Sequence, residues 1–227
     1  MSDASHKFDP SILREYDIRG VVGKTLHVAD AKAIGRTFGT LVRRKGGKKV
    51  ALGYDGRLSS PDLAAACTEG LVAAGCEVVQ IGVAATPMLY FAVYHLEADG
   101  GIQITGSHNP PDYNGFKMMM GKKSFFGADI TKLGEMAGKG DWEAGKGSVV
   151  KKDILGDYAA RLLKDVKPGK KLKVAWDTGN GAVGVSIRAV VDKLPGTHFI
   201  LNEKVDGTFP AHHPDPTVPK NLEQLVA

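Results

Sequence analysis

Residues 48–81 read KKVALGYDGRLSSPDLAAACTEGLVAAGCEVVQI and alternate between two kinds of pattern. The short β-branched run Lys48–Tyr54 predicts a strand, and Cys76–Ile81 predicts another. Between them, the sequence predicts a helix that runs to about Ala74, with Ser60 as its N-cap, Pro61 in its first turn and Gly75 at its end. This order indicates two parallel strands connected by a helix.

The same alternation continues on both sides of this stretch. Ala29–Arg44 predicts an amphipathic helix, Thr86–Leu96 predicts another helix, and Gly101–Thr105 (GIQIT) predicts a third strand. Strands that are separated by helices pair in parallel, and their connecting helices lie on the faces of the sheet. We therefore expect an α/β fold with a mixed, mostly parallel sheet sandwiched by helices.

The pattern begins again near residue 150, which predicts two domains, residues 1–150 and residues 151–227. The elements expected in the second domain are the helix Asp153–Val166, the strand Leu172–Asp177, the helix Gly181–Lys193 and the strand His198–Leu201. So few elements leave sheet edges and a helix face uncovered, so we expect this second α/β domain to be incomplete.

Composition excludes several classes of protein. The 227 residues include 30 Lys and Arg against 25 Asp and Glu, and the segment 139–173 alone has ten basic and five acidic residues. Because this segment lacks an interleaved aromatic platform, we expect a solvated connection between domains and no nucleic-acid partner.

No run of about 18 apolar residues and no signal peptide is recognisable, so we expect a cytoplasmic protein with no membrane partner. Cys67 and Cys76 are expected to be buried thiols.

The segment Gly101–Met118, GIQITGSHNPPDYNGFKM, contains the strongest candidate site. Its strand runs into a loop at the carboxyl end of the sheet, where open α/β sheets bind ligands. Ser107 has a hydroxyl on a loop stiffened by two prolines, and such a hydroxyl can serve as a nucleophile or group carrier. His108 offers an imidazole, Asn109 a donor, and Lys117 a cation or, once neutral, a base. The alternative is an ordinary turn with a capping serine and a surface histidine.

Two arginines lie in other glycine-containing loops. Arg19 is part of YDIRG, and Arg57 is part of GYDGRLSSP. Arginine in such loops suits bidentate contact with phosphate oxygens. For Arg57 the alternative is a structural pairing with a carboxylate, either Asp55 or Asp62.

Six motifs together resemble the α-D-phosphohexomutase family, closest to its phosphomannomutase/phosphoglucomutase branch. They are YDIRG at 16–20, GYDGRLSSP at 53–61, TPM at 86–88, TGSHNPPDYNGFKM at 105–118, WDTGNGAVG at 176–184 and DGTFPAHHPDP at 206–216. The resemblance extends from about Phe8 to the last residue. It implies interconversion of hexose 1-phosphate and hexose 6-phosphate, of mannose or glucose, through a phosphoserine and a bisphosphosugar. TGSHNP and NGFK favour this branch over phosphoglucosamine mutase, which stays an alternative.

The resemblance also implies roles for individual residues. Ser107 matches the phosphoryl carrier, and an oxygen of its phosphate would be one ligand of Mg²⁺. His108 and Asn109 would line the same centre, with Lys117 as the expected proton acceptor. Two further residues, Tyr16 and Arg19, match the amino-terminal contacts to the reacting phosphate. Glucose 1,6-bisphosphate is the expected activator.

One departure from the family pattern concerns the metal. The family binds magnesium with an aspartate-rich loop, and this sequence contains no Asp-x-Asp. We expect that loop beyond Ala227, so the chain is expected to be an amino-terminal fragment that is inactive alone, with its second domain cut before the metal loop. The alternative is a noncatalytic fragment or degenerate relative that folds and binds anions without turnover. The choice between glucose and mannose is left open.

Overall fold

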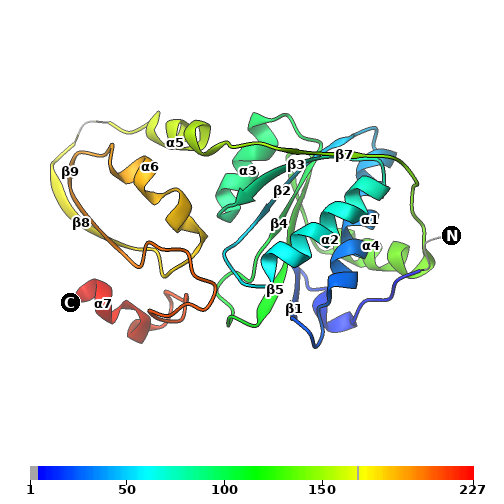
Figure 1. Cartoon of the computed structure of the whole chain (residues 1–227), viewed down its shortest axis with the longest axis horizontal. Coiled ribbons are helices and arrows are strands. Elements are labelled where there is room, and N and C mark those ends of the chain that lie inside the picture. The colour runs from blue at the N-terminus through cyan, green and yellow to red at the C-terminus, as the bar shows by residue number, and fades with distance from the viewer. Residues whose placement is uncertain (1–4, 168) are drawn as a thin grey trace.

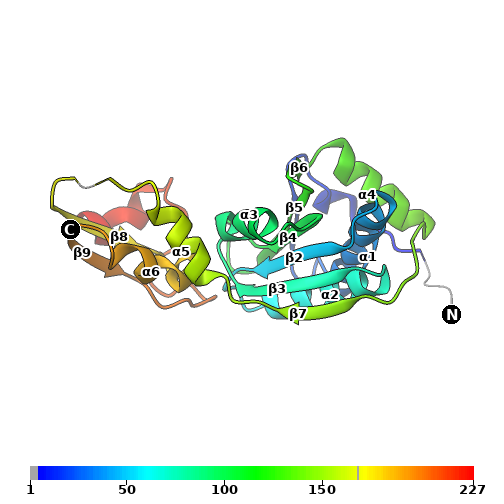
Figure 2. The ribbon, with the colours of Figure 1, turned by 90° about the horizontal axis from the view of Figure 1, so that it is seen from above.

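The computed structural model describes residues 5–167 and 169–227, and these form a larger and a smaller α/β unit along the chain (Figures 1 and 2). The strands of the larger unit are β1 (Ile18–Val21), β2 (Lys49–Tyr54), β3 (Glu77–Val83), β4 (Gly100–Ile104), β5 (Tyr113–Met120), β6 (Lys123–Phe125) and β7 (Ser148–Lys151). They lie in the order β1-β5-β4-β2-β3-β7, with β6 beside β5.

Six of these seven strands run in one direction. The pairs β2–β4, β2–β3 and β3–β7 are parallel, whereas β5 is antiparallel to β1, β4 and β6. Since β5 opposes all three of its neighbours, it is the single reversed strand of the described sheet. The expectation of a mixed, mostly parallel sheet is confirmed.

Helices cover both faces of this sheet. A short 3-10 helix, η1 (Pro10–Ile12), precedes β1, and the α-helices are α1 (Val28–Arg44), α2 (Ser60–Ala73), α3 (Thr86–His95) and α4 (Ala128–Lys139). Figure 1 shows α3 on one side of the sheet and α1, α2 and α4 on the other. Successive residues of β2 point to opposite faces, so Leu52 is buried in the core beside α1 and α2, and Ala51 in the core beside α3.

The two cysteines are free and buried, as the sequence indicates. Cys67 lies on α2, and Cys76 precedes β3. Burial raises the pKa of the Cys67 thiol, and it raises the pKa of Cys76 to about 11. Both side chains therefore remain thiols at neutral pH and act as small apolar core residues.

The smaller unit contains one two-stranded sheet. Its elements are α5 (Leu155–Leu163), β8 (Leu172–Asp177), η2 (Ala182–Val185), α6 (Ile187–Val191), β9 (Gly196–Leu201), η3 (Pro219–Leu222) and α7 (Glu223–Val226). The strands β8 and β9 are parallel, and Leu172 and Phe199 are more than half exposed. A sheet of two strands with exposed apolar residues fits the expected incomplete second α/β domain.

Three expectations need correction. The segment 139–173 is not only a solvated connection, because β7 lies within it and pairs with β3. All four residues of β7 are exposed, and its two adjacent valines do not form the alternation of apolar and polar residues that marks a half-buried strand. The helix expected over Gly181–Lys193 is broken into η2 and α6, and the N-cap of α2 is Ser59 rather than Ser60. In addition, β1, β5, β6 and α4 were not predicted.

The two units contact each other at the end of α3. The ring of Phe91 lies 5.5 Å from that of Tyr158, and His95 lies 3.1 Å from the Asp157 carboxylate. None of the helices in the described part of the chain is both long enough and apolar enough to cross a membrane.

Candidate active site

Ser107 lies at the tip of the loop that leaves β4. Its backbone has φ +53°, in the left-handed region that residues other than glycine seldom adopt, and its side chain is exposed. The Ser107 N–H donates to Thr105 Oγ1 at 2.9 Å, which closes the first turn of the loop. A strained backbone at an exposed hydroxyl needs support from the rest of the loop.

Arg57 gives that support. Its side chain is only 1% exposed, and its guanidinium donates to four carbonyl oxygens of the serine loop. The acceptors are Ser107 (3.0 Å), Asn109 (2.7 Å), Tyr113 (3.1 Å) and Pro110. A planar group with five donors can bind several carbonyls at once, so Arg57 fixes the path of the loop.

Asp55 completes this arrangement. Its Oδ2 accepts from the Gly106 N–H at 2.9 Å and from Arg57 Nε at 3.2 Å, and its Oδ1 accepts from Ser60 Oγ at 2.6 Å. An added Cβ at Gly106 would collide with the Arg57 guanidinium, so only glycine fits there. Burial lowers the pKa of Arg57, and Asp55 opposes this. Of the two interpretations of Arg57, the pairing with Asp55 is correct.

A second cluster, formed by Asp17, Arg19 and Lys117, lies beside the loop on β1 and β5. Arg19 Nη2 donates to Asp17 Oδ2 at 2.6 Å, and Lys117 Nζ donates to the same oxygen at 3.0 Å. Arg19 is opposite Gly115 in the β1–β5 pair, and the Gly115 carbonyl accepts from Thr105 N–H. Gly115 thus lies between Arg19 on β1 and Thr105, the residue at which the serine loop begins.

The cluster of Asp17, Arg19 and Lys117 has more positive than negative charge. Burial alone would raise the pKa of Asp17, but Arg19 and Lys117 outweigh it, so the pKa of this carboxyl lies below its ordinary value. One carboxylate and two cations leave a net positive charge. Such a charge beside an exposed hydroxyl can stabilise a phosphoryl group in transfer.

His108 and Asn109 have other partners in the structure. His108 Nδ1 lies 2.9 Å from the Pro214 carbonyl oxygen, which joins the serine loop to the smaller unit. The Asn109 side chain donates to the Gly106 carbonyl at 3.0 Å. Phe209 of the smaller unit also contacts the loop support, with its ring 5.1 Å from Arg57 Cζ.

Tyr16 is exposed and stacks on Phe126, with ring centroids 6.4 Å apart. These two rings, Tyr90 and Lys117 line a cavity of about 250 Å³, to which Met118, Ser124 and Phe125 also contribute. Ser107 does not line this cavity. The structure therefore brings Tyr16 and Lys117 to one cavity, joins Arg19 to Lys117 through Asp17, and places Ser107 on the loop after β4.

Sequence reasoning missed Asp17, Phe126 and Phe209 as site residues. Asp17 stands inside the YDIRG motif, between the two residues selected from it, so the motif itself held the signal. Phe209 stands inside the DGTFPAHHPDP motif, but the motif does not indicate its contact with Arg57, and Phe126 lies outside the six motifs. Only the folded chain brings these two rings to the site.

Magnesium is the metal that the resemblance implies. In residues 5–167 and 169–227, no three His, Cys, Asp or Glu side chains lie together as metal ligands. Asp55, the carboxylate that contacts the loop, already accepts from Arg57, Ser60 and Gly106. The residues present do not form a magnesium site, and a phosphate on Ser107 would supply only its own oxygens.

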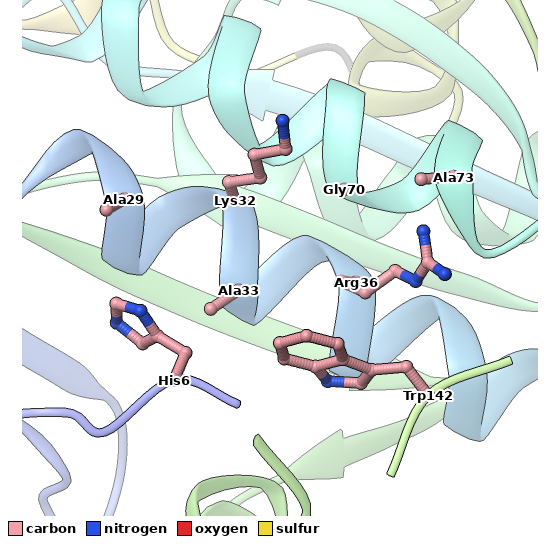
Figure 3. Close-up of a pocket in the computed structure, with 8 residues that line it drawn as sticks. All are labelled: His6, Ala29, Lys32, Ala33, Arg36, Gly70, Ala73 and Trp142. Carbon is pink, nitrogen blue, oxygen red and sulfur yellow. The ribbon is translucent and has the colours of Figure 1, made fainter. Parts of the chain in front are cut away.

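A separate cavity of about 190 Å³ lies on the side of α1 and α2 (Figure 3). It is lined by His6, Ala29, Lys32, Ala33, Arg36, Gly70, Ala73 and Trp142. His6 contacts Asp30 at 2.7 Å and Lys32 contacts Glu69 at 3.2 Å, so each of these groups already has an acidic partner. We assign no function to this cavity.

The chain is similar to known proteins in sequence and in fold. The family described as "Phosphoglucomutase/phosphomannomutase, alpha/beta/alpha domain I" matches residues 10–138. The chain belongs to this phosphoglucomutase/phosphomannomutase family. A phosphomannomutase/phosphoglucomutase of Pseudomonas aeruginosa is 45% identical over 217 residues, which cover 96% of this chain and 47% of that protein. A phosphoglucomutase of Neisseria meningitidis is 44% identical over 218 residues, 95% of this chain and 47% of that protein.

Solved structures of phosphoglucomutase/phosphomannomutase proteins have the same fold. A family protein from Burkholderia thailandensis superposes with a TM-score of 0.92 at 41% identity, covering 96% of this chain and 50% of that one. A putative phosphomannomutase from Thermus thermophilus gives a TM-score of 0.80 at 26% identity, covering 98% and 52%. The chain spans about half the length of the curated relatives it matches.

Proposed function

We propose that the whole protein, meaning this chain with the rest of its reading frame, is a phosphohexomutase. It would interconvert hexose 1-phosphate and hexose 6-phosphate, of mannose or glucose, through a phosphoserine at Ser107 and a bisphosphosugar. The observation that carries this proposal is the exposed Ser107 hydroxyl on a loop fastened by Arg57, together with two cations, Arg19 on β1 and Lys117 on β5, that share the Asp17 carboxylate. The names of the relatives support the same activity.

Phosphoryl transfer depends mainly on positioning and on neutralising charge, and this chain supplies part of each: Arg57 positions the serine loop, and Arg19 and Lys117 carry positive charge. The bond between phosphorus and Ser107 Oγ would break as a sugar hydroxyl oxygen forms a new bond to phosphorus. Lys117, once neutral, would accept the proton of that hydroxyl, and this proton would pass on to the serine oxygen as it leaves, which restores the serine hydroxyl and the neutral lysine. Transfer of the second phosphoryl group from the bisphosphosugar to Ser107 would restore the phosphoserine.

The aromatic cavity is a suitable place for the sugar. Its volume of about 250 Å³ and its Tyr16 and Phe126 rings suit a hexose, and Lys117 in its wall could reach a hydroxyl. Arg19 would contact the reacting phosphate, because its Nη1 is buried without a hydrogen-bond partner among the described residues. His108 and Asn109 would keep the serine loop in place through their own contacts.

We propose Mg²⁺ and glucose 1,6-bisphosphate as the cofactor and activator of the whole protein. Since the described residues form no magnesium site, the carboxylate ligands would come from outside this chain, with one phosphoserine oxygen at residue 107. A cytoplasmic location is part of this proposal and agrees with two unpaired, buried cysteines.

The test is incubation of the whole protein with glucose 1,6-bisphosphate, followed by mass spectrometry of its peptides. We expect the phosphate on Ser107, and we expect Ser107→Ala to abolish both labelling and turnover. Ser148→Ala, in the exposed strand β7, is the matched control and should keep both. Phosphate found only on Ser59 or Ser60 would rule out the assignment.

A noncatalytic relative that binds anions is the second candidate, favoured by the lack of a metal cluster in the described residues. The same experiment separates the two. A whole protein that binds phosphate but neither labels Ser107 nor turns over hexose phosphate would be this second kind.

A further inference from the structure

One carboxylate oxygen joins the two cations of the proposed site. Asp17 Oδ2 accepts from Arg19 Nη2 at 2.6 Å and from Lys117 Nζ at 3.0 Å, although Lys117 lies 100 residues away along the chain. The register of the β1–β5 pair brings these residues together. Ile18 is opposite Phe116, so the preceding residue, Asp17, lies across from the following residue, Lys117.

Burial makes this carboxylate necessary for Arg19. The Arg19 side chain is 2% exposed and that of Asp17 is 14% exposed. A buried guanidinium without a carboxylate partner is costly, so Arg19 depends on Asp17 for its position. With Nη2 on Asp17, the remaining group Nη1 has no partner among the described residues and is left for an incoming anion.

Lys117 does not depend on Asp17 in the same way. Its side chain is 27% exposed and lines the aromatic cavity, so water could solvate the ammonium without a carboxylate. A flexible lysine would then occupy many orientations, and the bond to Asp17 selects one of them. Burial raises the pKa of Tyr90, and the negative charge of Asp17 adds to this, so the carboxylate acts at the cavity wall itself.

We infer that Asp17 is a positioning residue that fixes Arg19 and Lys117 relative to each other and to Ser107. This inference rests on the proposed function. Asp17 does not contact the reacting atoms in this arrangement; it acts through the two cations. Loss of the Asp17 carboxylate would leave Ser107 intact. It would misplace Arg19, which would neutralise the phosphate charge, and Lys117, which would accept the proton of the sugar hydroxyl.

The principal test compares Asp17→Asn with wild type in the whole protein. The amide is nearly isosteric but neutral, and it holds two cations poorly. We expect kcat to fall by about tenfold or more, with a smaller change in KM and a cooperative thermal transition retained. Asp17→Glu keeps the charge on a longer side chain and should recover part of kcat. Asp9→Asn is the matched control and should leave kcat unchanged, because the exposed Asp9 carboxylate accepts from Ser11 and from no other residue in the described part of the chain.

A second measurement does not use activity. In the 227-residue chain, ¹⁵N NMR of the Arg19 side chain should show hindered rotation of the guanidinium in wild type and averaging in Asp17→Asn. Unchanged Arg19 signals, or a kcat of Asp17→Asn within about twofold of wild type, would overturn the inference. A wild-type protein without turnover and without Ser107 phosphate would instead refute the proposed function, while the NMR comparison would still show whether Asp17 holds Arg19.

Discussion

Arg57 is the residue on which the serine loop depends most. Four loop carbonyls and one carboxylate are satisfied by a single buried guanidinium. Arg57→Lys keeps the charge but offers three donors from one atom, which cannot reach four carbonyls. We expect a loss of about 2–3 kcal/mol in the free energy of unfolding, measured by chemical denaturation of the chain.

The control for this prediction is Arg188→Lys. Arg188 pairs with Glu203 at the surface, where an exposed ion pair contributes about 1 kcal/mol or less. If both variants lose equally little stability, the four carbonyl contacts of Arg57 do not support the loop.

The proposed role of Lys117 as a base can also be tested by single substitutions. Lys117→Ala and Lys117→Arg should both lower turnover of the whole protein without unfolding it, because the side chain faces a cavity rather than the core. Arginine keeps the charge but does not deprotonate near neutral pH, so it cannot replace a base. Turnover and melting temperature measured on the same samples decide the matter: full activity of Lys117→Arg would exclude the base role.

At the scale of elements, His212 joins the end of β8 to the segment after β9. Its Nε2 lies 2.7 Å from Asp177 Oδ2, and its Nδ1 lies 2.9 Å from the His213 carbonyl oxygen. Both ring nitrogens face acceptors, so the doubly protonated ring fits best. The His213 carbonyl raises the pKa of His212, partial burial opposes this, and Asp177 adds to the rise, so the net pKa is above its ordinary value.

This shift gives a pH dependence of stability. A raised pKa in the folded protein stabilises it fully below the ordinary histidine pKa of about 6.5, and the contribution is lost as pH rises through the folded value. His212→Gln should therefore destabilise the chain more near pH 6 than near pH 9, by chemical denaturation. His213→Gln keeps the main-chain carbonyl and is the control. A His212→Gln penalty independent of pH would contradict the prediction.

At the scale of the whole molecule, the two units contact each other at the serine loop as well as at the end of α3. His108 reaches Pro214, and Arg57 lies over the Phe209 ring. These contacts support the loop, but the described residues form no magnesium site. Positioning of the serine and neutralisation of the transferred charge are thus only partly present.

We therefore expect residues 1–227 alone to give no measurable mutase turnover. A coupled assay with glucose 1-phosphate, glucose 1,6-bisphosphate and Mg²⁺ would compare this chain with the whole protein. Loss of the metal should lower the rate by orders of magnitude. Turnover within about tenfold of the whole protein, a difference of about 1.4 kcal/mol, would show that this chain is sufficient by itself.

Local patterns in the sequence determined the strands β2, β3 and β4, the helices α1, α2 and α3, and the order that makes the sheet mostly parallel. Hydrophobic period and capping residues act within one turn or one strand, so they can be recognised without the fold. The serine loop was identified for the same reason, since Ser107, His108 and Asn109 are contiguous. The exposed strand β7 has no such pattern and was missed.

Only the tertiary structure decided what these residues contact. Asp17 meets Lys117 because β1 pairs with β5 across 100 residues, and Arg57 supports the serine loop from more than 50 residues away. The choice between phosphate contact and structural pairing for Arg57 depends on burial, which the local sequence does not specify. Long-range pairing sets both the register and the burial, because each depends on which distant strands and loops pack together.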